Sequence, residues 1–201
     1  MSYGWTDGVG SSRVGRQATV QLARTRRKAE DVGGLLEMLS WDETTYDKWL
    51  SRYVIKGLGA IGDPQAVEGL SAQLRHPDHH VRMYAARALG ALRSSWAVDP
   101  LIDALQDSDA VVRESAAFGL GDIGDPRATI PLGTVLSADP TGSVRASAAQ
   151  ALGQIGEPSS EARLVSALDD DFILVRQEAA FALAEIGGGA ERVEAEGRAA
   201  P

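Results

Sequence analysis

Val112-Arg113-Glu114-Ser115-Ala116-Ala117-Phe118-Gly119-Leu120-Gly121-Asp122-Ile123-Gly124 is the clearest copy of a pattern that returns along the whole chain. The first apolar residue of each copy serves as its anchor. The anchors are Leu50, Val81, Val112, Val144 and Val175, so successive copies are 31, 31, 32 and 31 residues apart. A fixed period of this length predicts an array of one supersecondary unit, which buries its apolar face only by stacking on copies of itself.

Each unit has the pattern of two helices. In the second helix, Val112, Ala116, Leu120 and Ile123 fall at i, i+4, i+8 and i+11, which places them on one apolar stripe. A short polar residue ahead of the anchor should cap the first turn of this helix, and these predicted caps are Asp47, Asp78, Asp109, Thr141 and Asp171. The first helix carries its own leucine pair, at Leu35/Leu39, Leu70/Leu74, Leu101/Leu105, Leu132/Leu136 and Leu164/Leu168.

The boundaries of the array follow from breaks in this pattern. A glycine, often followed by Asp-Pro as at residues 124–126, ends the second helix, and this signal lapses at residues 93–95, where the chain reads Arg-Ser-Ser. Residues 16–28 read as a helix without the motif that caps the first unit, and residues 40–46 as a longer turn. We predict an all-α, right-handed α-solenoid of about five antiparallel helix pairs. Residues 1–12 form a flexible arm, residues 13–187 a single array with its capping helix, and residues 188–201 a short cap or disordered tail.

The repeated motif resembles the HEAT-like repeats of the phycobilisome-lyase type. The resemblance covers roughly residues 30–187, and it departs from the pattern in the first unit, where Ser51 replaces the arginine. It implies the solenoid fold, but it says little about chemistry, because that family includes lyase subunits and scaffolds. HEAT-type hydroxylases carry paired His-Glu dipeptides for a di-iron centre, and this chain contains no His-Glu dipeptide.

Charge and composition exclude several classes of partner. The chain has a net charge of −8, but residues 1–28 carry six basic side chains against one acidic one, so the array itself is strongly acidic. An acidic array argues against nucleic-acid binding, including that of a HEAT-like DNA glycosylase, because such binding depends on neutralising phosphates. No apolar run is long enough to cross a bilayer and no signal peptide is apparent, so we expect no membrane partner and a cytoplasmic location.

The repeated arginines are an attractive but misleading feature. Arg82, Arg113, Arg145 and Arg176 recur in register with aspartates of the turns, which favours a structural role as bridges between neighbouring units over a binding row. Positions that vary while the motif holds are more informative. Relative to each anchor, positions −1, +3 and +6 share a face of the second helix that the apolar stripe does not occupy, and we expect this face to line the concave surface.

This variable face is rich in aromatic and basic side chains at its N-terminal end, and such residues are enriched in binding hot spots. The alternative is that some of the rings fill gaps between units. The predicted partner-binding residues are Trp49, Arg52, Tyr53, Lys56, His80, Met83, Tyr84, Arg87, Phe118 and Phe181. Since its basic side chains surround the rings, a protein or peptide segment with an acidic portion is the expected partner.

Enzymatic sites find little support. The chain has no cysteine, no phosphate-binding glycine loop with its lysine and no nucleophile elbow. All three histidines lie in residues 76–80, but Asp78 has a capping role there and no second ligand set is visible, so we expect no metal and no cofactor. The apolar run at residues 172–175 leaves an end that we expect to cap itself or to form a homo-oligomer through the C-terminal repeat.

Two functions therefore stay open. The first is a non-enzymatic protein-binding scaffold or adaptor that uses the concave face. The second follows the resemblance and is a lyase or chaperone-like subunit that handles a tetrapyrrole chromophore or its carrier protein.

Overall fold

The computed structural model describes residues 13–39 and 48–198, with side chains over residues 19–39 and 50–187. All regular structure in these ranges is helical, and the described residues contain no strand. The α-helices are α1 (Arg13–Lys28), α2 (Val32–Leu39), α3 (Lys48–Ile61), α4 (Val67–Gln73), α5 (His79–Ala91), α6 (Val98–Ala104), α7 (Ala110–Ile123), α8 (Thr129–Ala138), α9 (Gly142–Ile155), α10 (Glu161–Ala167) and α11 (Ile173–Arg198). Short 3₁₀ turns precede four of them, at η1 (Pro64–Ala66), η2 (Ser95–Ala97), η3 (Pro126–Ala128) and η4 (Pro158–Ser160).

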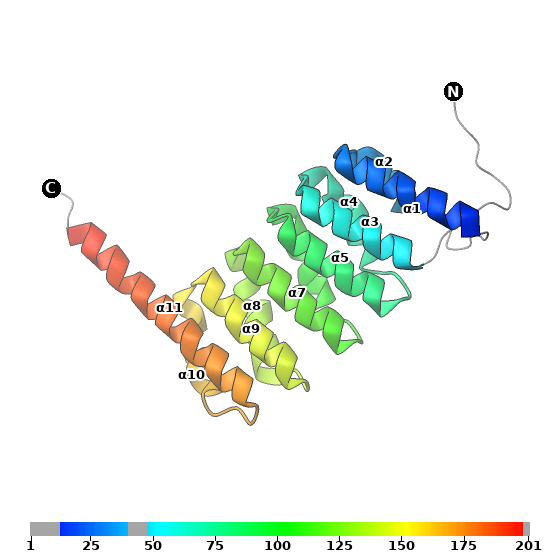
Figure 1. Ribbon diagram of the computed structural model, residues 1–201. Coiled ribbons are helices and arrows are strands. Elements are labelled where there is room, and N and C mark those ends of the chain that lie inside the picture. Colours follow the sequence, from blue (N-terminus) through cyan, green and yellow to red (C-terminus); the bar gives the residue numbers. More distant parts are fainter. Residues whose placement is uncertain (1–12, 40–47, 199–201) are drawn as a thin grey trace.

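The helices form a solenoid of two layers. The second helices of the units, α3, α5, α7, α9 and α11, lie side by side, and each packs against the next (Figure 1). The first helices, α2, α4, α6, α8 and α10, form the other layer, and each contacts the second helix of its own unit. The predicted all-α solenoid of stacked helix pairs is confirmed.

Helix α1 closes the N-terminal end of the array. It packs against both α2 and α3, and its Ala23 is fully buried. Helix α1 therefore lies where the sequence predicts the capping helix, and it begins at Arg13 rather than at residue 16. The predicted arm, the long turn of the first unit and the cap Asp47 lie outside the described residues.

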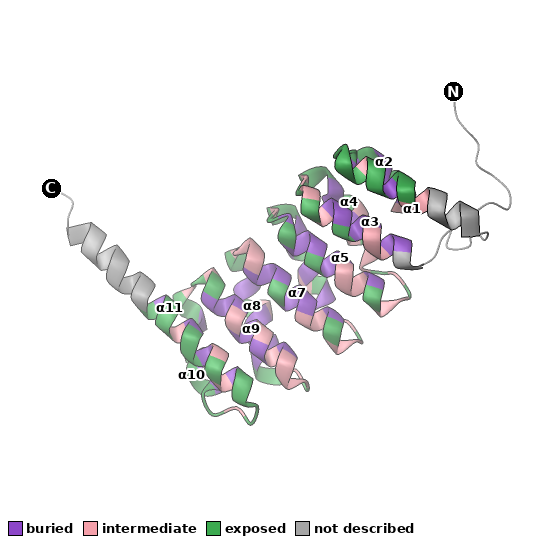
Figure 2. Cartoon of the chain, viewed as in Figure 1, coloured by how far each residue is buried: buried purple, intermediate pink, exposed green. Residues whose placement is uncertain are grey.

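The core lies between the two layers, and the motif residues form it. The buried residues run as a continuous band through the second helices in Figure 2. The anchors Val81, Val112 and Val144 have no exposed surface. Small residues set the helix spacing: a methyl group on Gly90 would lie 2.5 Å from the Cα atom of Gly119 in the next unit. The motif therefore buries itself by close stacking on its own copies.

The turns ahead of the second helices match the prediction in part. Asp78 and Asp109 cap α5 and α7 by accepting the amide of the residue two positions on. The prediction for Thr141 is wrong, because its side chain caps nothing and its hydroxyl lies 3.5 Å from an Arg113 nitrogen. At the start of α11 the predicted cap is Asp171. The amide of Phe172 donates instead to the carboxylate of Asp170, the residue before it.

Left-handed residues end the second helices. Gly62, Gly124 and Gly156 have φ of 77°, 72° and 75°, which glycine adopts without steric cost. In the second unit, where the glycine signal lapses, Arg93 takes this conformation with φ of 49°.

Helix α11 differs from the other second helices in length. Its Gly187 occupies the position of Gly124 and Gly156, but the helix continues through it to Arg198. The predicted boundary between array and tail therefore falls inside a continuous helix. Within the described residues, no helix combines the length and the apolar character needed to cross a membrane.

The strain at Arg93 leads to a prediction. A left-handed conformation costs a non-glycine residue about 1–2 kcal/mol, so Arg93→Gly should raise the free energy of unfolding by about 1 kcal/mol in urea denaturation. The control is Arg75→Gly, which removes another exposed turn arginine whose φ is negative, and this change should lower the stability. Equal effects of the two substitutions would contradict the assignment.

Candidate functional site

The motif arginines link neighbouring units. The Nε and Nη2 atoms of Arg82 donate to Asp107 at 2.7 and 2.8 Å, and its Nη1 donates to the carbonyl of His76 in the turn ahead of its own helix. Arg113 binds Asp139 in the same way at 2.7 and 3.0 Å, and Arg145 binds Asp170 at 2.8 and 2.7 Å. We call each of these three Arg–Asp pairs a rung. Because the guanidinium groups are fully engaged and largely buried, the prediction that these arginines are structural is confirmed for the three rungs.

Each rung keeps its aspartate ionised. Burial is the largest influence on the pKa of Asp107 and raises it, but hydrogen bonds from Arg82 and the Asp109 amide, together with nearby arginine charges, hold the pKa below its ordinary value of 3.8. The pKa of Asp139 is lowered against burial in the same way. At Asp170 the hydrogen bond from Arg145 is the largest influence and lowers the pKa.

These lowered pKa values predict a dependence of stability on pH. A carboxyl group whose pKa is lower in the folded state stabilises the fold fully above its unfolded pKa of about 3.9, and this contribution is lost as the pH falls through the folded pKa. Asp139→Asn removes one rung, so it should lower the free energy of unfolding at pH 7 by about 2 kcal/mol and should weaken the loss between about pH 4 and pH 2.

Urea denaturation at several pH values measures both effects. Asp99→Asn is the control, because this carboxylate pairs with Arg127 at the surface, where an ion pair is worth little. An acid dependence of Asp139→Asn identical to that of the unsubstituted chain would contradict the role of the rung.

The variable positions of the second helices form a surface that we call the second-helix face. Most side chains at positions −1 and +6 are exposed, whereas those at position +3 are half-buried or, at Ser115, buried. Its outermost positions carry large apolar side chains on two helices: Val111 and Phe118 of α7 are 44% and 43% exposed, and Leu174 and Phe181 of α11 are 45% and 67% exposed. On α9, which lies between α7 and α11, the same positions carry Ser143 and Gln150, so Phe181 is separated from the other rings.

Cations and rings alternate at the N-terminal end of this face. The Arg27 guanidinium carbon lies 5.9 Å from the ring centroid of Tyr53, and the Lys56 ammonium nitrogen lies 5.7 Å from that of Tyr84. Both distances are in the range of cation–π attraction. We call Arg27, Tyr53, Lys56 and Tyr84 the cation–ring row, and it spans α1, α3 and α5.

The structure shows one of the two roles that the sequence left open for the tyrosines, which is packing between units. Tyr53 and Tyr84 are half-buried and pack against the core, and a cation lies over each ring. The structure thus brings together three predicted site residues and adds Arg27, which sequence reasoning missed. The sequence signal for Arg27 was the basic stretch before the first unit. The position of Arg27 over Tyr53 depends on how α1 folds back.

The other predicted site residues lie on α3, α5, α7 and α11. On α5, His80 and Arg87 are exposed like Lys56, whereas Arg52 of α3 and Met83 of α5 are half-buried. The side chain of Trp49 lies outside the described residues.

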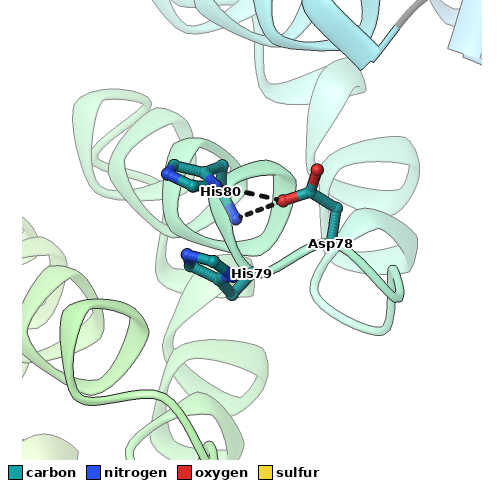
Figure 3. Close-up of side chains that lie close together, drawn as sticks. All are labelled: Asp78, His79 and His80. Carbon is teal, nitrogen blue, oxygen red and sulfur yellow. Dashed lines mark hydrogen bonds and ion pairs between the residues drawn. The ribbon is translucent and has the colours of Figure 1, made fainter.

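The histidine turn contains a cluster with metal-ligating atoms. One ligand atom from each of Asp78, His79 and His80 lies within 4.8 Å of the others (Figure 3). The Asp78 Oδ1 atom, however, accepts the His80 amide at 2.8 Å, and Arg82 donates to the carbonyls of His76 and Pro77 beside it. A helix N-terminus and an adjacent arginine both oppose a bound cation, so the geometry favours the capping role of Asp78.

Comparison with protein families agrees with the fold. The family model for HEAT repeats matches residues 32–121, 67–141 and 129–195. The chain belongs to the HEAT-repeat family. The matches cover all five units, and none of the curated proteins matches the chain.

Solved structures give the same result. The complex of CpcE and CpcF of phycocyanin lyase from Nostoc sp. PCC7120 is 26% identical with a TM-score of 0.59, over 92% of this chain and 79% of that one. Importin beta is 25% identical with a TM-score of 0.55, over 82% of this chain and 25% of that one. A designed armadillo repeat protein in complex with the peptide (KR)4 has a TM-score of 0.62 at 15% identity, over 89% of this chain and 96% of that one. The predicted resemblance to HEAT-like repeats of the phycobilisome-lyase type is confirmed.

Proposed function

We propose that this protein is a non-enzymatic binding scaffold of the cytoplasm, whose second-helix face holds a segment of a partner protein. The cation–ring row is the observation that supports this best. Aromatic rings packed on the core and covered by long cations offer much contact area at a low entropic cost, which is typical of binding hot spots. The exposed Phe118 extends this surface onto α7.

Charge along the face suggests how the partner lies. Basic side chains belong to α1, α3 and α5, among them Arg27, Lys56 and Arg87, whereas Glu178 and Glu185 lie on α11 at the other end. A segment with an acidic portion over α3 and α5 would replace the solvent around the cations, and an apolar portion could then cover Phe118. Opposite charges at the two ends would fix the direction of the segment.

A matched pair of peptides tests this proposal. We expect a labelled peptide with an acidic half and an apolar aromatic half to bind, and its lysine-substituted counterpart to bind at least tenfold more weakly. Lys56→Glu with Arg87→Glu should reduce binding of the acidic peptide at least tenfold, which corresponds to about 1.4 kcal/mol. Fluorescence polarisation at low salt measures this, because screening weakens exposed charge pairs.

The control variant is Arg163→Glu, which reverses an exposed charge on α10, away from the second-helix face. Trp49→Ala with Tyr84→Ala should abolish binding while circular dichroism shows unchanged helical content. If Arg163→Glu weakened binding as much as the face variants, the proposal would fail. The same variants then serve as controls when the partner is identified by capture and mass spectrometry.

A second candidate is a lyase or chaperone-like subunit that handles a tetrapyrrole or its carrier protein. It is favoured by the likeness to the phycocyanin lyase complex, which extends over 92% of this chain at 26% identity. The Lys56 ammonium and the Arg87 guanidinium could bind the propionates of such a chromophore beside the Tyr84 ring.

Titration with a bilin separates the two functions. A tetrapyrrole-handling subunit should shift and sharpen the visible absorption of the bilin, and Lys56→Glu with Arg87→Glu should remove this shift. If the spectrum of the bilin is unchanged at micromolar protein, the tetrapyrrole-handling function is excluded and the scaffold function remains.

A further inference from the structure

The series of rungs is incomplete at the C-terminal end of the array. Arg176, the last motif arginine, donates from Nη1 to the carbonyls of Asp170 and Asp171 at 2.7 and 3.2 Å, as the other motif arginines do with their own turns. In each rung the Nε and Nη2 atoms bind an aspartate of the next unit. Among the described residues, no carboxylate lies within ion-pair distance of these atoms of Arg176.

The apolar surface around Arg176 is open as well. Leu168 is 37% exposed, whereas Leu105 and Leu136 at the same position are 2% and 3% exposed. Ala180 is exposed, whereas its counterparts Ala86, Ala117 and Ala149 are fully buried. In the inner units the following repeat covers these positions.

The first unit shows that the motif arginine can be absent from a unit. There, Ser51 stands in place of the arginine and His76 in place of the aspartate of the next turn, so both partners of this rung are missing together. In the last unit the arginine is present although the described chain supplies no aspartate. An aspartate placed as in the three rungs would complete the contacts of Arg176.

We propose that the C-terminal end of the array is a docking surface for a helical repeat of a partner protein, which offers an aspartate ahead of a helix to Arg176 and covers Leu168 and Ala180. This surface is separate from the second-helix face, and the inference goes beyond the proposed function.

The described residues do not cover this surface with a further unit. At the position of Gly187 the inner second helices end in a left-handed residue, which is a glycine in three units and Arg93 in the second, but α11 continues to Arg198. The expected self-association through this end stays a prediction, and the charges oppose it. Two copies joined end to end would face Arg176 with Arg176, and a copy joined head to tail would present the N-terminal end, which α1 covers.

Ala184 limits how closely the partner can approach. Its counterparts in the inner units are Gly59, Gly90, Gly121 and Gly153, where a methyl group would come within 2.5–3.0 Å of backbone atoms of the next unit. The methyl group of Ala184 therefore keeps the second helix of the partner further away, while the Arg176 half of the surface stays accessible.

The test uses the full chain with residues 157–187 duplicated after Gly187. The junction then repeats the natural Gly156-Glu157-Pro158, and the duplicated Asp170 faces Arg176. We expect Arg176→Ala to lower the unfolding midpoint of the extended chain by about 4 °C more than that of the parent chain. Alanine at the duplicated Asp170 should have the same effect, and the double variant should lose no more than either single variant.

Ala184→Gly is the matched control for the close approach. It should raise the midpoint of the extended chain and lower that of the parent, because only the extended chain has a helix facing this residue. Equal loss from Arg176→Ala in the two chains would overturn the proposal. A parent chain that is a dimer in light scattering and becomes a monomer with Arg176→Ala would also overturn it, in favour of a second copy.

Capture from cell extract then separates the two surfaces. The end-on surface is supported by a helical-repeat protein that binds both the parent chain and the double variant Lys56→Glu with Arg87→Glu. The same protein should bind neither the Arg176→Ala variant nor the extended chain. Loss with the Lys56→Glu, Arg87→Glu variant alone assigns the captured protein to the second-helix face and counts against end-on docking.

Discussion

The bond between an arginine of one unit and an aspartate of the next is the interaction on which the array depends. Each rung joins three segments, because the arginine also binds its own turn and the aspartate also accepts an amide of the turn that contains it. In the rung of Arg113, for example, Asp139 accepts the Thr141 amide at 2.9 Å while it binds the guanidinium at 2.7 Å. One carboxylate therefore sets both the shape of a turn and the spacing between units, which explains why the sequence period is so constant.

This arrangement uses the constant residues for architecture and leaves the variable ones for function. The anchors and small residues are buried where units stack, and three of the four motif arginines are engaged in rungs. Most side chains at positions −1 and +6 are exposed, so they can change without loss of the fold. The cation–ring row is a partial exception, because Tyr53 and Tyr84 also pack on the core, which holds their rings in place for a partner.

The sequence alone was sufficient for features that depend on local periodicity. Helix order, the structural role of Arg113 and the cap at Asp109 follow from residues a few positions apart or exactly one period apart. Features that depend on competition or on remote packing did not follow. Thr141 is a good capping residue by type, but its amide donates to Asp139 and its hydroxyl faces the guanidinium of Arg113. The pairing of Arg27 with Tyr53 requires α1 to fold back over α3, and no periodic signal encodes that contact.

A ladder of rungs also gives the array a direction. The third and fourth units each present an arginine toward the following unit and an aspartate toward the preceding one, so the two ends of an array of such units are chemically different. In this chain the N-terminal end is closed, because α1 covers it and Ser51 with His76 removes the first rung. The C-terminal end keeps its arginine and an apolar surface. In an array built in this way a further rung can form in one direction only, from the unit that keeps a free pair of arginine nitrogens toward the unit that follows it.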